Sequence, residues 1–313
     1  MTPRRHPTPA VARAGASLLV ALALAGCGAI ANTFTPAPHS ANHVTIELAG
    51  APNALYAGFY EAQALGYFKQ TDLDVRFQIP ARGQNPLTML HDGRVLLAVA
   101  SEPSVFLQRN LNEPVAGVAA LLHAPLNTIR ITLPAAPPTG GTAPVTGAPA
   151  HGQRKSSRSK RVVSAPAVTT VPAPVTQVWP AKLRQLLAAP GAPTYDGLTV
   201  AVRAETITDR SGVLRRFIQA LARGYRAARA DPAQAVSKLI AANPALAPRR
   251  RYELAMLKAA LPEMFPPGLR VWGFQREAQW NAFGTWMTTN HVLTNPNAVS
   301  SASTNQLLQG QGI

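Results

Sequence analysis

Side chains suited to binding a small heterocyclic molecule follow two of the apolar, strand-like runs in the first half of the chain. After the first run, Asn53 offers a hydrogen-bond donor and an acceptor, and Tyr56 and Tyr60 offer rings for stacking. Ser101 and Glu102 follow the third run, and the Glu102 carboxylate accepts hydrogen bonds from amino groups. Because ligands of open α/β sheets bind beyond the carboxyl ends of the strands, these five residues are predicted ligand contacts.

The same residues have structural alternatives, which the sequence leaves open. Asn53 could cap a helix, Tyr56 could pack at the rim of the core, and Glu102 could cap the helix that begins beside Pro103. A sixth predicted ligand contact, Tyr195, lies in the segment PTYDGLTVAV, just before a later strand.

Motifs of the familiar catalytic classes are absent from the sequence. It contains no GxSxG, no GxGxxG after a strand, no GxxxxGK[ST] and no HExxH. The seven histidines are scattered without the spacing of metal ligands. Cys27 is the only cysteine, which excludes an internal disulfide or a CxxC site. We therefore predict a binding protein rather than an enzyme, with no catalytic residue, metal or cofactor.

The elements that must position these residues alternate between strands and helices. Strand-like runs at residues 44–48, 75–79, 96–100 and 115–122 alternate with helical patterns, which is typical of βαβ units and a mainly parallel sheet. In the first predicted helix, Leu55, Phe59 and Ala62 share a face that packs on the sheet. Tyr56 and Tyr60 occupy another face, which we expect to border a cleft. Gly66 is expected to end this helix.

The second half of the chain is mostly helical. A short helix is predicted at 180–189 and a strand at 197–202, and Val213, Phe217 and Leu221 mark the buried stripe of a longer helix. Further helices are predicted from Pro232, from Pro248 and over 275–290. Their apolar stripes are interpreted as core, because a helix must bury one face.

The chain begins with features of a secreted protein. Residues 1–27 combine three arginines with a short apolar run that ends in Leu-Ala-Gly-Cys, which predicts a signal peptide and resembles a bacterial lipobox with Cys27 as the lipidated residue. An ordinary signal peptide, with Cys27 incidental, is the alternative. Residues 28–43 are small, polar and proline-containing, as expected of a flexible tether.

Residues 134–178 interrupt the pattern. They are rich in Pro, Ala, Gly, Thr and Ser, and are predicted to form a disordered or loosely extended linker. The linker contains RKSSRSKR at 154–161, either a solvated charge block or a site for an anionic partner. Its five charges and the three leader arginines account for half of the formal +16, so the rest is moderately basic and no nucleic-acid partner is predicted.

Several segments follow one another in a characteristic order: ALGYF, LDVRF, LHDGRVLLAVASEPSVFLQRN, PTYDGLTVAV and FIQALARGYRAARADPAQAV, and then QWNAFGTWM and TNQLLQGQGI at the end of the chain. This ordered set resembles the substrate-binding proteins of ABC transporters for thiamine-pyrimidine precursors and sulfonates. The resemblance implies an α/β fold of the periplasmic-binding-protein type II kind, in which the loops containing Asn53 and Glu102 line the cleft. One branch of that family consists of enzymes with a cysteine-rich motif, which this chain lacks.

The resemblance weakens between the predicted strands 129–133 and 197–202, which are similar to the family's two interlobe crossovers. Relatives have a second lobe there, whereas this chain has mainly the low-complexity segment. We therefore predict a first lobe at 44–133, a second lobe that is truncated or replaced by the linker at 134–178, and a helical region at 179–313 that packs on the first lobe.

Two functions follow from these features. The first is a monomeric, lipid-anchored, extracytoplasmic receptor that passes a small aromatic or heterocyclic nutrient to the permease subunits of an ABC importer. The alternative is a degenerate one-lobe relative without a transported ligand, acting as a surface interaction module.

Overall fold

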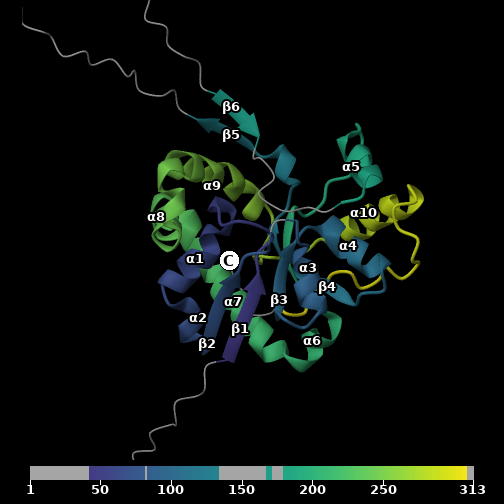
Figure 1. The fold of residues 1–313 in the computed structure, drawn as a ribbon, viewed down its shortest axis with the longest axis horizontal. Coiled ribbons are helices and arrows are strands. Elements are labelled where there is room, and N and C mark those ends of the chain that lie inside the picture. The colour runs from purple at the N-terminus through teal and green to yellow at the C-terminus, as the bar shows by residue number, and fades with distance from the viewer. Residues whose placement is uncertain (1–41, 82, 134–166, 171–178, 309–313) are drawn as a thin grey trace, which may run out of the picture. The chain divides into compact units, whose positions relative to one another are not determined.

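The computed structural model describes residues 42–81, 83–133, 167–170 and 179–308 (Figure 1). All of these residues belong to one of two units of the chain, Ser40–Ile313. The other unit, Met1–His39, lies outside the described residues, and with it the predicted signal peptide, the lipidation site Cys27 and most of the tether. The predicted linker also lies outside them, except for residues 167–170, which form strand β6.

A mixed, mainly parallel sheet organises the described residues, as the sequence predicts. Its strand order is β2-β1-β3-β7-β4. β1 pairs in parallel with β2 and β3, whereas β7 is antiparallel to its neighbours β3 and β4. The strands are β1 Asn42–Glu47, β2 Leu73–Gln78, β3 Leu97–Ala100, β4 Val115–Leu122 and β7 Leu198–Arg203. The late strand β7 thus lies inside the sheet that the first half of the chain forms.

The predicted strand at 129–133 is β5, Arg130–Leu133, and it pairs antiparallel with β6, Ala167–Thr170, in a separate two-stranded sheet. Between β5 and β7, the part of the chain that the structure describes contains β6 and one helix, α5, Ala181–Ala188. The remaining helices are α1 Ala57–Ala64, α2 Tyr67–Gln70, α3 Pro86–His91, α4 Glu102–Asn110, α6 Ala204–Asp209, α7 Ser211–Ala230, α8 Pro232–Ala242, α9 Arg250–Met264 and α10 Glu277–Thr289.

Helices cover both faces of the sheet, and alternate strand residues show why (Figure 1). In β3, Leu97 and Val99 join the core formed with α1, α7, α8 and α9. Ala98 and Ala100 face the opposite way and join the core formed with α3, α4 and α10. Since successive side chains of a strand point to opposite faces, a strand that is apolar throughout must be covered on both.

Two glycines allow α1 and α7 to approach closely. A Cβ atom at Gly224 would lie 2.2 Å from the carbonyl oxygen of Gly58, and one at Gly58 would lie 2.4 Å from the ring of Tyr225. Contacts this short leave no room for any larger residue. The long helix α7 therefore lies directly against the first helix of the chain.

The C-terminal segment closes the β4 edge of the sheet. Gly117 of β4 donates to the carbonyl of Ala302 at 2.9 Å and accepts from the amide of Thr304 at 2.9 Å. Arg109, at the end of α4, donates to the carbonyls of Ala298 at 2.7 Å and Asn297 at 3.2 Å. A covered edge strand has no unpaired backbone groups to offer another chain.

Two predictions about the helices are wrong. Tyr56 and Tyr60 do not border an open cleft, because α7 and α8 pack against α1 and leave the two rings 0% and 6% exposed. The helix predicted from Pro248 begins two residues later, since Pro244–Arg249 form a 3-10 turn. The end of the first helix is confirmed, because Gly66 adopts a left-handed conformation with φ 70° after α1.

Candidate functional site

Three segments of the chain meet where the parallel strands of the main sheet end. Ser101 and Glu102 follow β3, and His123 follows β4. Tyr195 and Asp196 precede β7, which is antiparallel and so begins at this same edge. The first half of the chain and the returning strand therefore place polar groups side by side.

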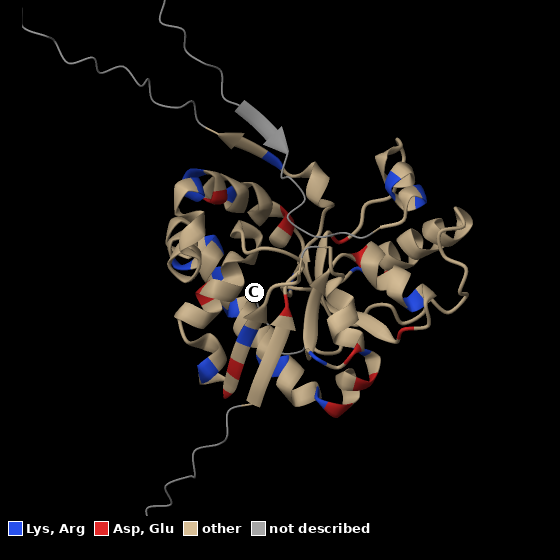
Figure 2. Cartoon of the chain, viewed as in Figure 1, with Lys and Arg blue, Asp and Glu red and all other residues tan. Residues whose placement is uncertain are grey.

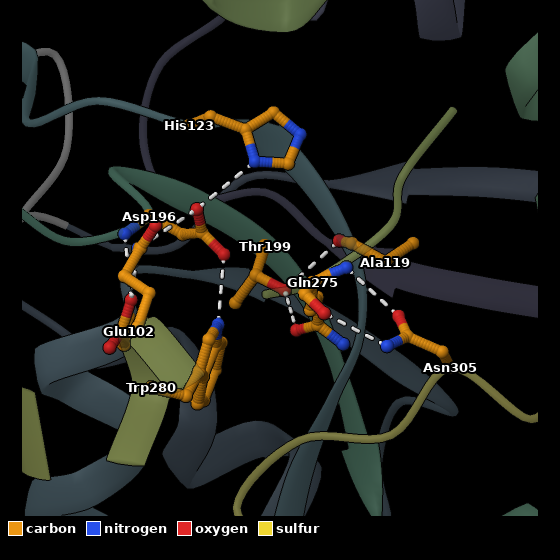
Figure 3. Close-up of polar contacts among 9 residues, drawn as sticks. Glu102, Ala119, His123, Asp196, Thr199, Gln275, Trp280 and Asn305 are labelled. Atoms are coloured by element: carbon orange, nitrogen blue, oxygen red, sulfur yellow. Dashed lines mark hydrogen bonds and ion pairs between the residues drawn. The ribbon is translucent and has the colours of Figure 1, made fainter. Parts of the chain in front are cut away.

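Glu102 and Asp196 are bound to each other through side chain and backbone (Figure 3). A Glu102 carboxylate oxygen accepts from the Asp196 amide at 2.8 Å, and the Glu102 amide donates to the Asp196 carbonyl at 3.0 Å. Gln279 of α10 donates to the same carboxylate oxygen at 3.3 Å. Glu102 is 0% exposed and Asp196 is 1% exposed. Burial, followed by the nearby charge of Asp196, raises the pKa of Glu102 well above its usual value.

Asp196 also connects Glu102 to Trp280 and His123 (Figure 3). Its carboxylate accepts from the Trp280 indole N–H at 2.9 Å. Its other oxygen lies 3.3 Å from Nδ1 of His123, a side chain that is 1% exposed. Oε1 of Glu102 and Nε2 of His123 are buried without a hydrogen-bond partner among the described residues. Such groups are costly to bury, so they are candidates for contacts with a bound molecule.

Tyr195 lies between this cluster and a cavity. Its ring packs edge-on against Trp179, with centroids 6.0 Å apart, and 5.1 Å from Phe283. Burial, followed by the charge of Glu102, raises the pKa of the Tyr195 hydroxyl. Tyr195 lines a cavity of about 230 Å³, together with residues of the loop before β7 and of the segment before β5.

Ser101 supports the same region through a short chain of hydrogen bonds. Its hydroxyl lies 2.8 Å from the Ser104 hydroxyl and accepts from the Ser104 amide at 3.4 Å, which caps α4. The Trp179 indole donates to the Ser104 hydroxyl at 3.0 Å. Ser101 thus starts the helix that follows β3, and it is 1% exposed.

The other three predicted contacts lie after β1 and are held by neighbouring helices. Asn53 caps the turn that precedes α1, accepting from the Leu55 amide at 2.9 Å and donating to the Ala51 carbonyl at 2.9 Å. Burial raises the pKa values of Tyr56 and Tyr60, and a hydrogen bond to the Asn243 side chain opposes the increase for Tyr60. The Tyr60 ring packs 5.2 Å from that of Phe77.

The structure therefore divides the six predicted contacts into two groups. Ser101, Glu102 and Tyr195 come together between β3 and β7, while Asn53, Tyr56 and Tyr60 pack under the helices beside β1. His123 and Asp196, which also belong to this cluster, are not among the contacts predicted from the sequence. His123 follows a predicted strand, so the rule that selected Glu102 could also have selected it. Asp196 precedes a predicted strand, and the rule would select it only if the antiparallel direction of β7 were known.

A larger concavity, of about 730 Å³, lies elsewhere, between α6, the start of α10 and the loop 299–306. None of the six predicted contacts lines it. The part of the chain that the structure describes has no group of three or more His, Cys, Asp or Glu residues that could hold a metal ion. None of its helices combines the length and apolar composition needed to span a bilayer.

The arrangement of strands and helices is the fold of the periplasmic binding proteins. The ligand-binding component of an ABC-type import system from Staphylococcus aureus has a TM-score of 0.51 at 12% identity, with 87% of this chain and 99% of that chain covered. The alkanesulfonate-binding protein SsuA from Xanthomonas axonopodis pv. citri, bound to MOPS, has a TM-score of 0.50 at 12% identity, with 84% and 98% covered. At such identities the likeness concerns the fold.

Within that class, residues 53–135 and 183–235 match the NMT1/THI5-like family. The formylaminopyrimidine-binding protein of Halalkalibacterium halodurans is 34% identical over 113 residues, which are 36% of this chain. The matched segment spans 33% of that relative's length. The two matched segments of the chain contain β3, Glu102 and β7, and so both sides of the cluster in Figure 3.

Proposed function

We propose that the protein is an extracytoplasmic solute-binding protein of an ABC importer, and that its ligand is a small heterocycle with an amino group. The observation that carries this proposal is the buried Glu102–Asp196 pair, which has an unpaired carboxylate oxygen at the carboxyl edge of the sheet. The match to the NMT1/THI5-like family over both sides of this pair supports it.

The charge of the pair favours an amino group over a sulfonate. The described partners of the Glu102 side chain are the Asp196 amide and Gln279, and the described ion pair of Asp196 is with His123. An amino group would donate to the free oxygen of Glu102 and satisfy it. A sulfonate has no proton to donate to that oxygen, and it would bring a negative charge beside two carboxyl groups, where burial and then their repulsion already raise the pKa of Glu102.

Tyr195 is the member of the cluster that lines the neighbouring cavity, and the size of this cavity limits a ligand that occupies it. Sites for small molecules typically span about 300 to 1,000 Å³, and the cavity beside Tyr195 is about 230 Å³. A single substituted ring is the size that such a site accommodates. Tyr195 supplies an aromatic surface at its wall.

Ligand titration tests this function. Thermal unfolding of the purified protein should shift upward with formylaminopyrimidine, because a ligand bound only by the native state stabilises it. MOPS, a sulfonate, should produce no shift at the same concentrations. An equal shift with both compounds, or a shift with MOPS alone, would overturn the assignment of the ligand class.

A second function, the degenerate one-lobe relative acting as an interaction module, is favoured by one observation. Between β5 and β7 the described residues contain β6 and α5, where the family resemblance implies a second lobe. A one-sided site would leave one ring face in water, with an affinity near millimolar rather than micromolar, a difference of about 4 kcal/mol. Titration to millimolar formylaminopyrimidine without a thermal shift would favour this second function.

The proposed anchor rests on the leader and on Cys27, which lie outside the described residues. A lipid on Cys27 would keep the body beside the permease subunits, with which it would work as a monomer. A Cys27→Ser variant should move from the membrane fraction to the soluble extracytoplasmic fraction. If the variant stays in the membrane fraction to the same extent as the wild type, lipidation at Cys27 is wrong.

A further inference from the structure

The outer face of α7 has an unusual charge. The helix carries five arginines in its 20 residues and no Asp or Glu. None of these arginines belongs to its buried stripe, which Val213, Phe217 and Leu221 continue along the helix. The arginines therefore project from the side of α7 that is turned away from the core.

Three of them, Arg216, Arg223 and Arg226, have no ion pair among the described residues. The Arg223 guanidinium lies 3.9 Å over the ring of Tyr67 in α2, which holds it in place without neutralising it. Nε of Arg216 and Nε of Arg226 are buried without an acceptor among the described residues. Burial, followed by the charge of Arg223, lowers the pKa of Arg226. These unneutralised guanidinium groups would be stabilised by an external anion.

The three side chains form a linear array rather than a pocket. Their spacing of seven and three residues keeps them on one side of the helix over about 15 Å, at 1.5 Å per residue. α2 packs beside α7 and carries another exposed basic residue, Lys69, two residues after the Tyr67 ring that Arg223 covers. Figure 2 shows that basic residues also occur on the other helices around the sheet, so the array is one part of a basic body.

We propose that this array, Arg216, Arg223 and Arg226 with Lys69, docks the protein on the anionic headgroups of a phospholipid membrane. The proposal rests on the extracytoplasmic, membrane-bound location proposed above, since a membrane is then the extended anionic surface within reach. A row of cations on one helix matches a plane of headgroups better than it matches a single small anion. The exposed large apolar side chains of the described residues, Ile79, Leu111 and Phe274, lie on other elements, so the contact would be electrostatic and superficial.

The test measures binding to vesicles of phosphatidylcholine with about 30% phosphatidylglycerol, and to pure phosphatidylcholine vesicles, at physiological salt. The full-length chain is used with Cys27→Ser and with the five basic residues of 154–161 replaced by glutamine, so that lipid and linker do not contribute. Arg216→Gln/Arg223→Gln/Arg226→Gln is compared with Arg251→Gln/Lys258→Gln/Arg270→Gln, which removes the same number of charges from exposed positions elsewhere. Far-ultraviolet circular dichroism and melting curves show that both variants are folded.

The parent chain should prefer the anionic vesicles. Each basic residue at such a surface contributes about 1 kcal/mol, so the α7 variant should lose on the order of 100-fold in affinity for them. The control variant should stay within about threefold of the parent, because charges beyond a Debye length of the surface are screened. Equal losses in the two variants, or no preference for anionic vesicles, would overturn the proposal.

One further outcome would contradict the proposal. If the array binds a single-stranded oligonucleotide more tightly than anionic vesicles, with the same dependence on the α7 arginines, a nucleic-acid surface replaces the membrane surface and the proposal is wrong. Solute titration is carried out without vesicles, so a failure of the proposed ligand and a failure of membrane docking are observed separately.

Discussion

The region after β1 and the region between β3 and β7 lie at the same edge of the sheet and differ in how completely they are filled. After β1, Glu253 of α9 accepts from the Ala54 amide at 2.8 Å, and the Tyr225 hydroxyl of α7 donates to the Leu55 carbonyl at 2.8 Å. Buried polar atoms without a hydrogen-bond partner among the described residues occur in both regions, both carboxylate oxygens of Glu47 at the end of β1 and Oε1 of Glu102 in the second region, but the second region also contains the cavity that Tyr195 lines. Polar residues after a strand thus have a structural role where helices cover them, and the ligand role is proposed for the region where a cavity lies beside them.

The largest expected effect concerns the helix-covered side. Gly224→Ala would place a Cβ 2.2 Å from the Gly58 carbonyl, so α1 and α7 must separate. Overpacking of this kind should lower the free energy of unfolding by about 3 kcal/mol, measured by urea denaturation. Gly212→Ala, in the same helix with open space around it, is the control and should be neutral or stabilising by up to about 1 kcal/mol. Equal effects of the two substitutions would show that the close contact of α1 and α7 does not stabilise this side.

The second effect tests which side binds the ligand. Glu102→Gln replaces a carboxylate oxygen that an amino group would meet, and charged hydrogen bonds contribute about 1.5 to 3 kcal/mol. The affinity for formylaminopyrimidine should therefore fall about 10- to 100-fold in isothermal titration. Tyr60→Phe, on the helix-covered side, should leave that affinity unchanged. A loss of binding in Tyr60→Phe with normal binding in Glu102→Gln would show that the ligand binds in the region after β1 and not between β3 and β7.

The third effect is a pH dependence of stability. Because the pKa of Glu102 is raised in the folded protein, the native state holds this proton more tightly than the unfolded chain does. Its contribution to stability is therefore complete below the unfolded pKa, near 4.5, and is lost as the pH rises through the folded pKa. Burial also raises the pKa values of Glu47 and Glu253, which act in the same direction.

Urea denaturation between pH 4.5 and 8 should show stability falling with pH in the wild type. The decrease should be smaller in Glu102→Gln, because Glu47 and Glu253 remain. An identical dependence of stability on pH in the wild type and the variant would mean that folding does not raise the pKa of Glu102.

The smallest expected effect, a change in the free energy of unfolding, tests the structural role of Asn53. Its side chain caps the turn before α1, and loss of a cap costs about 1 kcal/mol, so Asn53→Ala should lower the free energy of unfolding by that amount. Asn85→Ala is the matched control, since Asn85 caps α3 by accepting from the Leu87 amide at 3.0 Å. Both variants should bind formylaminopyrimidine as the wild type does. Loss of binding in Asn53→Ala, with normal binding in Asn85→Ala, would show that the ligand site includes the region after β1.

Local sequence signals are sufficient to predict most of the elements and the class of fold. Apolar runs such as 115–122 predict strands, and Pro86 and Glu102-Pro103 mark helix starts, because these signals act over a few residues. The family resemblance, carried by the order of such segments, is supported by the match at 53–135 and 183–235.

Packing between distant segments of the chain determines which predicted contacts come together. Asp196 reaches Glu102 because β7 inserts antiparallel beside β3, and at a sequence separation of 94 positions no local signal predicts that pairing. Tyr56 and Tyr60 are buried because α7 and α8, more than 150 residues later, cover the second face of α1. A helix pattern shows which side chains share a face, but whether that face meets water, a ligand or another helix depends on contacts between segments far apart in the chain.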